Sequence, residues 1–276
     1  MALRNRSKNS GNQPEWLKRA SDLRFTGHVG NGVTQLKFEL PSLEDAASAV
    51  YDQQLLCDAG RPDGKLTGLD LLMKVVRDID ANQADSTAYD PQLLQQVTKF
   101  KRFFKASPFT GISIVGSVPG QFGEARVTLE TTENSLRLHG RTPTPQRVRL
   151  VGTLDGLEAS TQRFSLLLDS GERVAGVYSE DLSDRLHGLW RKRVLVLGTS
   201  VFRVSGNLLR VEADSIEDGT NASLLFSTMP IASNGRMNTS RLRKPQGPRS
   251  GMAAIMGRWP GDETEEEIEE ALEQVS

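Results

Sequence analysis

The residues with the most informative spacing lie near the C-terminal end of the sequence, where they form the pattern of an amphipathic helix. Thr264 and Glu267 have the spacing of a capping box, in which two side chains satisfy backbone N–H groups at a helix start. Apolar residues then recur at i, i+3, i+4 and i+7 and would share one helix face, from Ile268 to Val275. These residue types predict non-covalent binding, because such an apolar stripe fits a groove on a partner protein.

Glutamates occupy most of the other positions of this helix. Pairs such as Glu265 with Glu269 and Glu266 with Glu270 are like charges at i, i+4, and each pair destabilises an isolated helix by roughly 0.2–0.5 kcal/mol. A helix this short is marginal in water, so we expect it to need a partner with an apolar groove surrounded by positive charge. Two alternatives remain open: the tail folds back onto its own chain, or it is a solvating acidic end.

A second group of apolar residues precedes the acidic helix, and we predict that it forms a further anchor for the partner. The charges around both groups are sorted along the chain. Only basic charges occur from Arg236 to Arg258, and only carboxylates occur from Asp262 to Glu273. The predicted partner-binding residues are Met252, Ile255, Met256, Arg258, Trp259, Ile268, Ala271, Leu272 and Val275.

Residues 257–273, GRWPGDETEEEIEEALE, resemble a C-terminal signature of many small bacterial antitoxins, GKWPGDET/S-x-EE(I/L)xxALEEL. Those antitoxins are encoded beside toxins that are PIN-domain ribonucleases. The resemblance implies an antitoxin-like protein of a bacterial toxin-antitoxin or related defence system, whose tail wraps the toxin. It also implies that the guanidinium of Arg258, at the basic position of the motif, pairs bidentately with the metal-binding carboxylates of a PIN active site.

Two features depart from that family. Most antitoxins of this kind are much shorter, and no ribbon-helix-helix or swapped-hairpin DNA-binding segment is recognisable in the sequence. Upstream, residues 147–218 resemble the corresponding part of uncharacterised bacterial proteins that end in the same way.

Two basic segments offer a different chemistry, the binding of nucleic acid. In the first, cations alternate with phenylalanines, which could neutralise phosphates and stack bases. However, Phe100 and Phe104 continue the apolar stripe of Leu93 and Val97, which favours a core position for the rings and a solvated face for the charges. The possible nucleic-acid-binding residues are Lys99, Lys101, Arg102 and Lys105 in the first segment and Arg241, Arg243 and Lys244 in the second.

Patterns for catalysis, metals and cofactors are not recognisable. The sequence contains no Walker, GxSxG or HExxH motif, and His28, His139 and His187 lie far apart. Asp78, Asp80 and Asn82 match the opening of a calcium loop, but Gln83 and Tyr89 stand where glycine and glutamate are required. The single cysteine, Cys57, excludes an intrachain disulfide. We therefore predict a protein that is not an enzyme and has no metal or cofactor.

Composition sets limits on the class of protein. Lys plus Arg total 34 and Asp plus Glu total 35, so the net charge of -1 argues against a uniformly basic nucleic-acid binder. Hydrophobic residues make up 37% of the chain, which permits a globular core. No stretch approaches the roughly 18 unbroken apolar residues of a membrane span. We expect a cytoplasmic protein with a protein partner and no membrane contact, while its oligomeric state and any repression of its own operon stay open.

The elements that position these residues begin with a basic arm, residues 1–21, whose composition predicts disorder. Residues 22–146 are expected to form an α+β domain, closed by a linker with Pro143 and Pro145. It should contain a hairpin of strands 23–27 and 33–40 around Asn31-Gly32, and helices that carry Leu43 to Val50, Leu69 to Ile79 and Leu93 to Phe104. Strands are expected at 111–118, 125–130 and 135–139.

Residues 147–218 have the clearest pattern of elements. Strands at 147–159, 162–170 and 172–179 precede a helix at 179–190 with Leu182, Leu186 and Leu189 inward, and strands at 192–204 and 207–216 follow. This order predicts an OB-like five-stranded β-barrel, with bends at Gly152 and Gly156. A flexible basic linker, 219–250, then leads to the tail, 251–276. The alternative function is an OB-fold single-stranded nucleic-acid-binding accessory protein with an acidic, protein-recruiting tail, although 147–218 has no basic excess.

Overall fold

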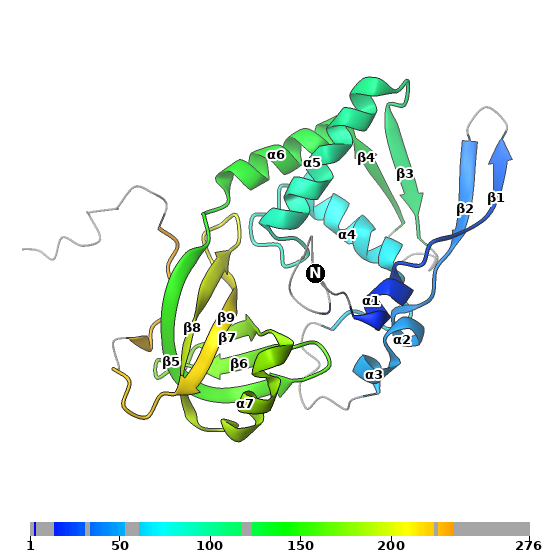
Figure 1. The fold of residues 1–276 in the computed structure, drawn as a ribbon. Coiled ribbons are helices and arrows are strands. Elements are labelled where there is room, and N and C mark those ends of the chain that lie inside the picture. Colours follow the sequence, from blue (N-terminus) through cyan, green and yellow to red (C-terminus); the bar gives the residue numbers. More distant parts are fainter. Residues whose placement is uncertain are drawn as a thin grey trace, which may run out of the picture. The chain divides into compact units, whose positions relative to one another are not determined.

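The computed structural model describes residue 3 and residues 14–30, 34–52, 61–116, 123–223 and 226–233. The chain divides into two units, Met1–Asn234 and Gly235–Ser276, and every described residue belongs to the first. The described residues combine helices, two hairpins and a closed five-stranded barrel (Figure 1). The mixture of helix and strand therefore matches the predicted fold class at this coarser level.

The N-terminal elements differ in part from the prediction. Glu15–Ala20, which lie in the segment predicted to be disordered, form helix α1, and Ala20 is buried among Leu43, Ala46 and Leu66. Strands β1 (Arg24–Gly30) and β2 (Thr34–Glu39) pair as predicted, with their side chains exposed or half-buried. The predicted helix that follows is two short helices, α2 (Leu43–Ala46) and α3 (Ser48–Tyr51).

Ala47 separates α2 from α3 because its backbone, at φ -127° and ψ 44°, is not helical. The break lets the two helices bury their apolar residues in different clusters. Leu43 and Ala46 pack with Ala20, whereas Ala47 and Val50 pack with Leu3. A periodic pattern alone cannot distinguish one helix from two that change direction at a single residue.

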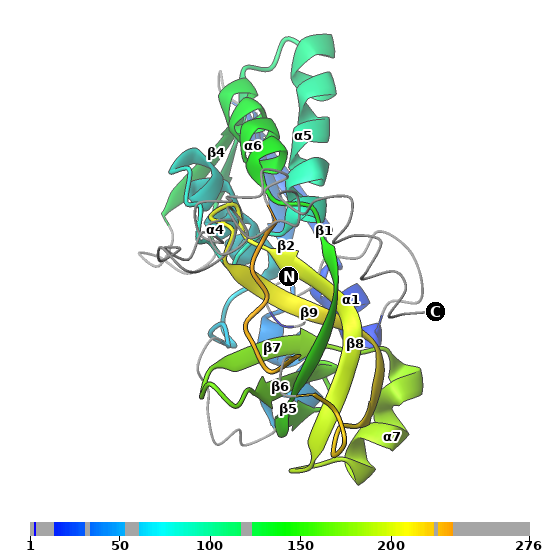
Figure 2. The ribbon, with the colours of Figure 1, turned by 90° about the vertical axis from the view of Figure 1, so that its left-hand side faces the viewer.

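Three longer helices follow: α4 (Gly68–Asp80), α5 (Pro91–Ala106) and α6 (Leu129–Arg141). We name the part of the unit that contains α1 to α6 the helical layer. Thr67 and Asp70 form a capping box at the start of α4, and Asp90 caps α5 by accepting the Leu93 N–H. Helices α5 and α6 lie side by side (Figures 1 and 2). Strands β3 (Gly111–Val115) and β4 (Glu124–Thr128) form the second hairpin between them in sequence.

The predicted strand at 135–139 is wrong, because these residues belong to α6. Thr128 and Thr131 form a capping box that begins this helix directly after β4. Ser135 and Leu138, three residues apart, are both fully buried, and the Ser135 hydroxyl donates to the Leu94 carbonyl at 2.8 Å. The alternation that resembled a strand is therefore one buried helix row.

The barrel contains five strands in the order β5-β6-β7-β9-β8, and β5 also pairs with β8, which closes it. All neighbouring strands are antiparallel except β7 and β9. The 3-10 helix η1 and helix α7 follow β7, so the order of elements is as predicted and is compatible with an OB-like fold. The bounds are β5 (Gln146–Glu158), β6 (Arg163–Leu167), β7 (Arg173–Val177), η1 (Glu180–Leu182), α7 (Ser183–Gly188), β8 (Arg193–Phe202) and β9 (Leu208–Asp218).

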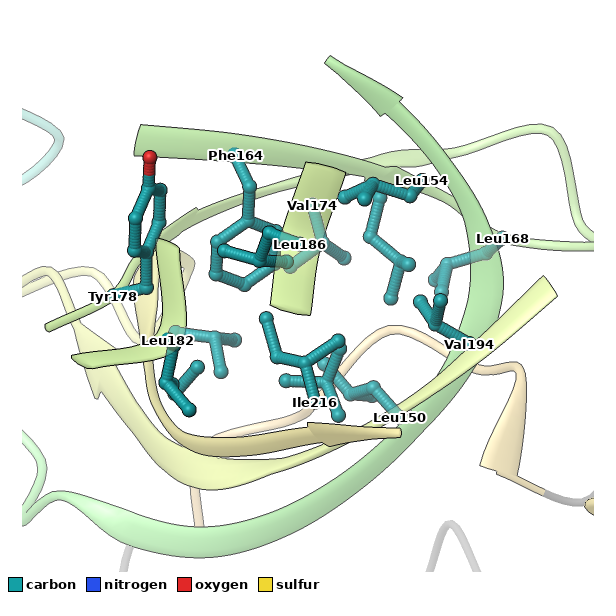
Figure 3. Close-up of a cluster of buried hydrophobic side chains, with 14 residues drawn as sticks. Leu150, Leu154, Phe164, Leu168, Val174, Tyr178, Leu182, Leu186, Val194 and Ile216 are labelled. Carbon is teal, nitrogen blue, oxygen red and sulfur yellow. The ribbon is translucent and has the colours of Figure 1, made fainter. Parts of the chain in front are cut away.

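Alternate residues of the barrel strands point into an apolar core. Phe164 and Leu166 of β6 are buried there. Leu182 and Leu186 enter the core from η1 and α7, as predicted (Figure 3). Gly176 of β7 faces the Phe164 ring, and a Cβ at this position would overlap ring atoms. A register shift between Leu154 and Gly156 marks the predicted irregularity in β5.

Candidate functional site

The surface of α5 carries the predicted basic and aromatic segment, and the structure corrects one part of that prediction. Leu94, Val97 and Phe104 form the buried row of the helix, whereas the Phe100 side chain is 43% exposed. Phe100 lies four residues before Phe104, so at roughly 100° per residue it stands about 40° from Phe104, at the edge of the buried row. Its exposure shows that the ring is only partly covered and is not a buried core residue.

Exposed aromatic rings gather at the C-terminal end of α5. Phe103 is 41% exposed and Phe109, just beyond the helix, is 58% exposed. Their rings are stacked, with centroids 5.8 Å apart and planes 7° from parallel. Phe109 was not among the residues predicted from the sequence; Pro108 is a local signal that the helix ends, but it does not indicate where the Phe109 ring lies.

The cations of this segment have different environments. Lys101 is half-buried and pairs with Glu133 of α6 at 3.4 Å. Lys99, Arg102 and Lys105 are exposed, and the Lys99 ammonium donates to the neutral side chain of Gln96 at 2.8 Å. We name the surface formed by Lys99, Phe100, Arg102, Phe103 and Phe109 the basic-aromatic face.

A buried ion pair joins the barrel to the helical layer. Arg210 of β9 donates to Asp90, the cap of α5, at 3.0 Å, and their side chains are 2% and 0% exposed. The same guanidinium also donates to Glu212 at 2.7 Å through Nη2 and at 2.9 Å through Nε. Because Asp90 also accepts the Leu93 N–H, one carboxylate orients both α5 and β9.

The turn between β8 and β9 makes further contacts between the barrel and the helical layer. Ser205 and Asn207 donate side-chain hydrogen bonds to Asp85, and the Ser205 N–H donates to the Ala84 carbonyl at 3.1 Å. The hydrogen bonds from Ser205 and then Asn207 hold the pKa of Asp85 below its usual value. Val204 is buried among Val75, Ile79 and other residues of the helical layer. The β8–β9 turn is therefore occupied by contacts within the chain.

The rest of the barrel surface offers few groups for stacking. Among the described barrel residues, Trp190 is the one large hydrophobic side chain that is strongly exposed, at 41%. The guanidinium of Arg191 lies over its ring, 6.0 Å from the centroid. Arg193 and Asp169 form a bidentate pair at 2.7 and 2.8 Å, and the hydrogen bonds from Arg193 are the main cause that lowers the pKa of Asp169.

The other candidate residues do not converge. His28 lies on β1, His139 near the end of α6 and His187 on α7, where its Nδ1 lies 2.8 Å from the Ser183 carbonyl oxygen. Asp78 accepts a hydrogen bond from Ser86. Within the described ranges, no group of three or more His, Cys, Asp or Glu side chains is arranged to hold a metal ion.

Several predicted residues lie outside the described part of the chain. These are Cys57, the basic residues Arg241, Arg243 and Lys244, and the whole predicted partner-binding set in residues 251–276. Among the described residues, no helix has the length and apolar character needed to span a membrane. No protein-family model, curated protein or solved structure matches this chain. Its function is therefore inferred from its own residues.

Proposed function

We propose that this protein is an antitoxin-like binding protein that neutralises a PIN-domain ribonuclease through residues 251–276. The observation that carries the proposal is the pattern GRWPGDETEEEIEEALE, which combines a capping box, an apolar stripe and a resemblance to antitoxin tails.

The apolar stripe supplies the binding energy in this proposal. Each large aliphatic side chain, such as Ile268 or Leu272, gains about 1.5–3 kcal/mol when it is fully buried. The surrounding glutamates repel one another in the free chain, and basic groups around the partner's groove would remove that repulsion. Trp259 is the expected central anchor, because tryptophan is enriched among the residues that dominate binding energy.

Arg258 would supply inhibition rather than affinity. A PIN active site holds its catalytic metal with clustered carboxylates, and a planar guanidinium can pair with a carboxylate through two parallel hydrogen bonds. An arginine in that position would occupy the place of the substrate phosphate. The neighbouring apolar anchors would keep it there.

The folded unit acts as a scaffold in this proposal, and we assign its barrel to the OB type. Oligonucleotide-binding barrels of this type use the face of their second and third strands and two loops, one between the first and second strands and one between the fourth and fifth. Here the second of these loops is the β8–β9 turn, which contacts Ala84 and Asp85. Strands β6 and β7 present no strongly exposed aromatic side chain among their described residues. These contacts favour a scaffold over the alternative of strand binding by the barrel.

Co-expression with the product of the adjacent gene, which this proposal expects to be a PIN-type ribonuclease, tests the proposal. The full chain should restore growth and capture the ribonuclease, whereas a chain that ends at Ser250 should do neither. Trp259→Ala and Leu272→Ala should each weaken binding by at least about 30-fold, the loss typical of a dominant contact. Glu270→Gln, on the opposite side of the predicted helix, is the matched control and should bind as the natural chain does.

Two outcomes bear directly on the mechanism. Arg258→Ala should keep most of the affinity and lose most of the inhibition, which separates its role from that of the anchors. Equal capture and equal rescue by the full chain and the shortened chain would overturn the proposal.

A further inference from the structure

The basic-aromatic face combines two features that are seldom exposed together. Phe100, Phe103 and Phe109 leave 41% to 58% of their surface in contact with solvent. A single exposed apolar residue is common on a protein surface, but a group of aromatic rings indicates a contact surface. The stacked pair, Phe103 and Phe109, shows that a flat ring can already lie parallel on this surface.

The charge around these rings is entirely positive along the local chain. No Asp or Glu occurs from Pro91 to Gly123. Within the described part of the chain, Arg102 and Lys105 form no ion pair with a carboxylate, in contrast to Lys101. The Lys99 ammonium donates to the neutral amide of Gln96, and this hydrogen bond does not neutralise its charge.

The spacing places cations and rings at neighbouring positions on the surface of α5. Lys99 and Phe103 are i, i+4 neighbours and Lys99 and Arg102 are i, i+3 neighbours, so these groups share one side of α5. A ligand that crosses this side of the helix meets positive charge and a ring face within one turn. Single-stranded nucleic acid has the matching chemistry, because each nucleotide carries a phosphate and a base that stacks.

We propose that the basic-aromatic face of α5 binds single-stranded nucleic acid. The phosphates pair with Lys99 and Arg102, and the bases stack on Phe100, Phe103 and Phe109. A duplex is a poor match, because its bases are already stacked and unavailable to the rings. This site is distinct from the C-terminal tail, and it does not depend on the proposed function.

Fluorescence anisotropy with the full chain tests this site. The probes are labelled oligouridine and oligodeoxythymidine of about 12 nucleotides, with a duplex of equal length for comparison. We expect binding to both single strands, weaker binding to the duplex, and an affinity that falls with salt. A preference between the two single strands would report contacts to the 2′-hydroxyl.

Substitutions then separate stacking from charge. Phe103→Ala should weaken binding about 5- to 150-fold, and Phe103→Trp should restore it, because it keeps a ring for stacking. The double variant Lys99→Gln with Arg102→Gln should reduce the slope of log affinity against log salt by about 1.4, or about 0.7 for each lost phosphate contact. Trp190→Ala and Arg191→Gln are matched controls, because they change an exposed ring and cation on the barrel.

The chain's own acidic residues, Asp262 to Glu273, carry the same sign of charge as a nucleic acid, so the test includes their competition for this face. A variant with Glu265→Gln, Glu266→Gln and Glu269→Gln tests that competition, since it removes charge from the tail. Binding by this variant alone would support the site and identify the tail as its competitor. Failure of both chains to bind at low salt would overturn the proposal, and so would a loss of binding on Trp190→Ala with none on Phe103→Ala.

Discussion

The ion pair between Asp90 and Arg210 allows a quantitative test of how the barrel is held to the helical layer. The two substitutions to compare are Asp90→Asn and Asp90→Ala. Asparagine keeps a side-chain oxygen that can accept the Leu93 N–H at 2.9 Å, and therefore keeps the helix cap. Alanine removes the cap and the charge together.

The size of the effect follows from burial. Removal of one partner from a buried ion pair costs about 3–5 kcal/mol, because the other charge stays away from water. Glu212 still contacts Arg210, at 2.7 Å, so the lower end of about 3 kcal/mol applies to Asp90→Asn. Loss of the cap adds about 1 kcal/mol, which gives a total of about 4 kcal/mol for Asp90→Ala.

Thermal unfolding followed by circular dichroism measures both values. For a unit of this size each kcal/mol lowers Tm by about 2–4 °C, so Asp90→Asn should lose about 6–12 °C and Asp90→Ala about 8–16 °C. Asp85→Asn alters an exposed carboxylate between the barrel and the helical layer, and it should leave Tm near that of the natural chain. An Asp90→Asn protein as stable as Asp85→Asn would refute the reasoning.

Three further changes test the barrel. Phe164→Ala should lower the free energy of unfolding by about 3–5 kcal/mol in a urea titration, because it leaves a cavity among buried strands; a loss below about 1 kcal/mol would show that the core collapses around it. Gly176→Ala should cost about 1–3 kcal/mol by overlap with the Phe164 ring, and Phe164→Leu should recover part of that loss; equal losses with either side chain at 164 would contradict the overlap. The pKa of Asp169 should rise toward its usual value in Arg193→Gln, as measured by NMR titration, because Arg193 favours the charged carboxylate; an unchanged pKa would exclude this cause. Since the folded pKa is depressed, the stabilising contribution of this pair is present above the unfolded pKa and is lost as the pH falls through the folded value.

Local patterns predicted the barrel well because its signals are short-range. Phe164 and Leu166 alternate along β6, Leu168 follows directly after its end, and all three are buried. The capping residues Thr67 and Asp90 likewise stand within one turn of the helix starts that they stabilise. In each case the residues that decide the structure lie within one element.

The features that the sequence did not predict depend on contacts between elements that are far apart in the chain. Which residues of α5 are covered depends on the elements packed against it: Ser135 of α6 contacts the buried Leu94, whereas Phe100 at the edge of the buried row stays exposed. The pair of Asp90 and Arg210 joins residues 120 positions apart, so no local spacing could predict it. For the same reason the exposed stacking of Phe103 on Phe109 emerged only from the fold.

The burial of Val204 in the helical layer has a consequence for any attempt to produce the barrel as an independent domain. A barrel produced without residues before Gln146 would expose Val204 and Arg210, which are now covered. A helical layer produced without the barrel would keep Asp90 without its Arg210 partner. Either piece would need new polar or apolar residues at these positions before it could be transplanted, so the smallest transferable unit includes both.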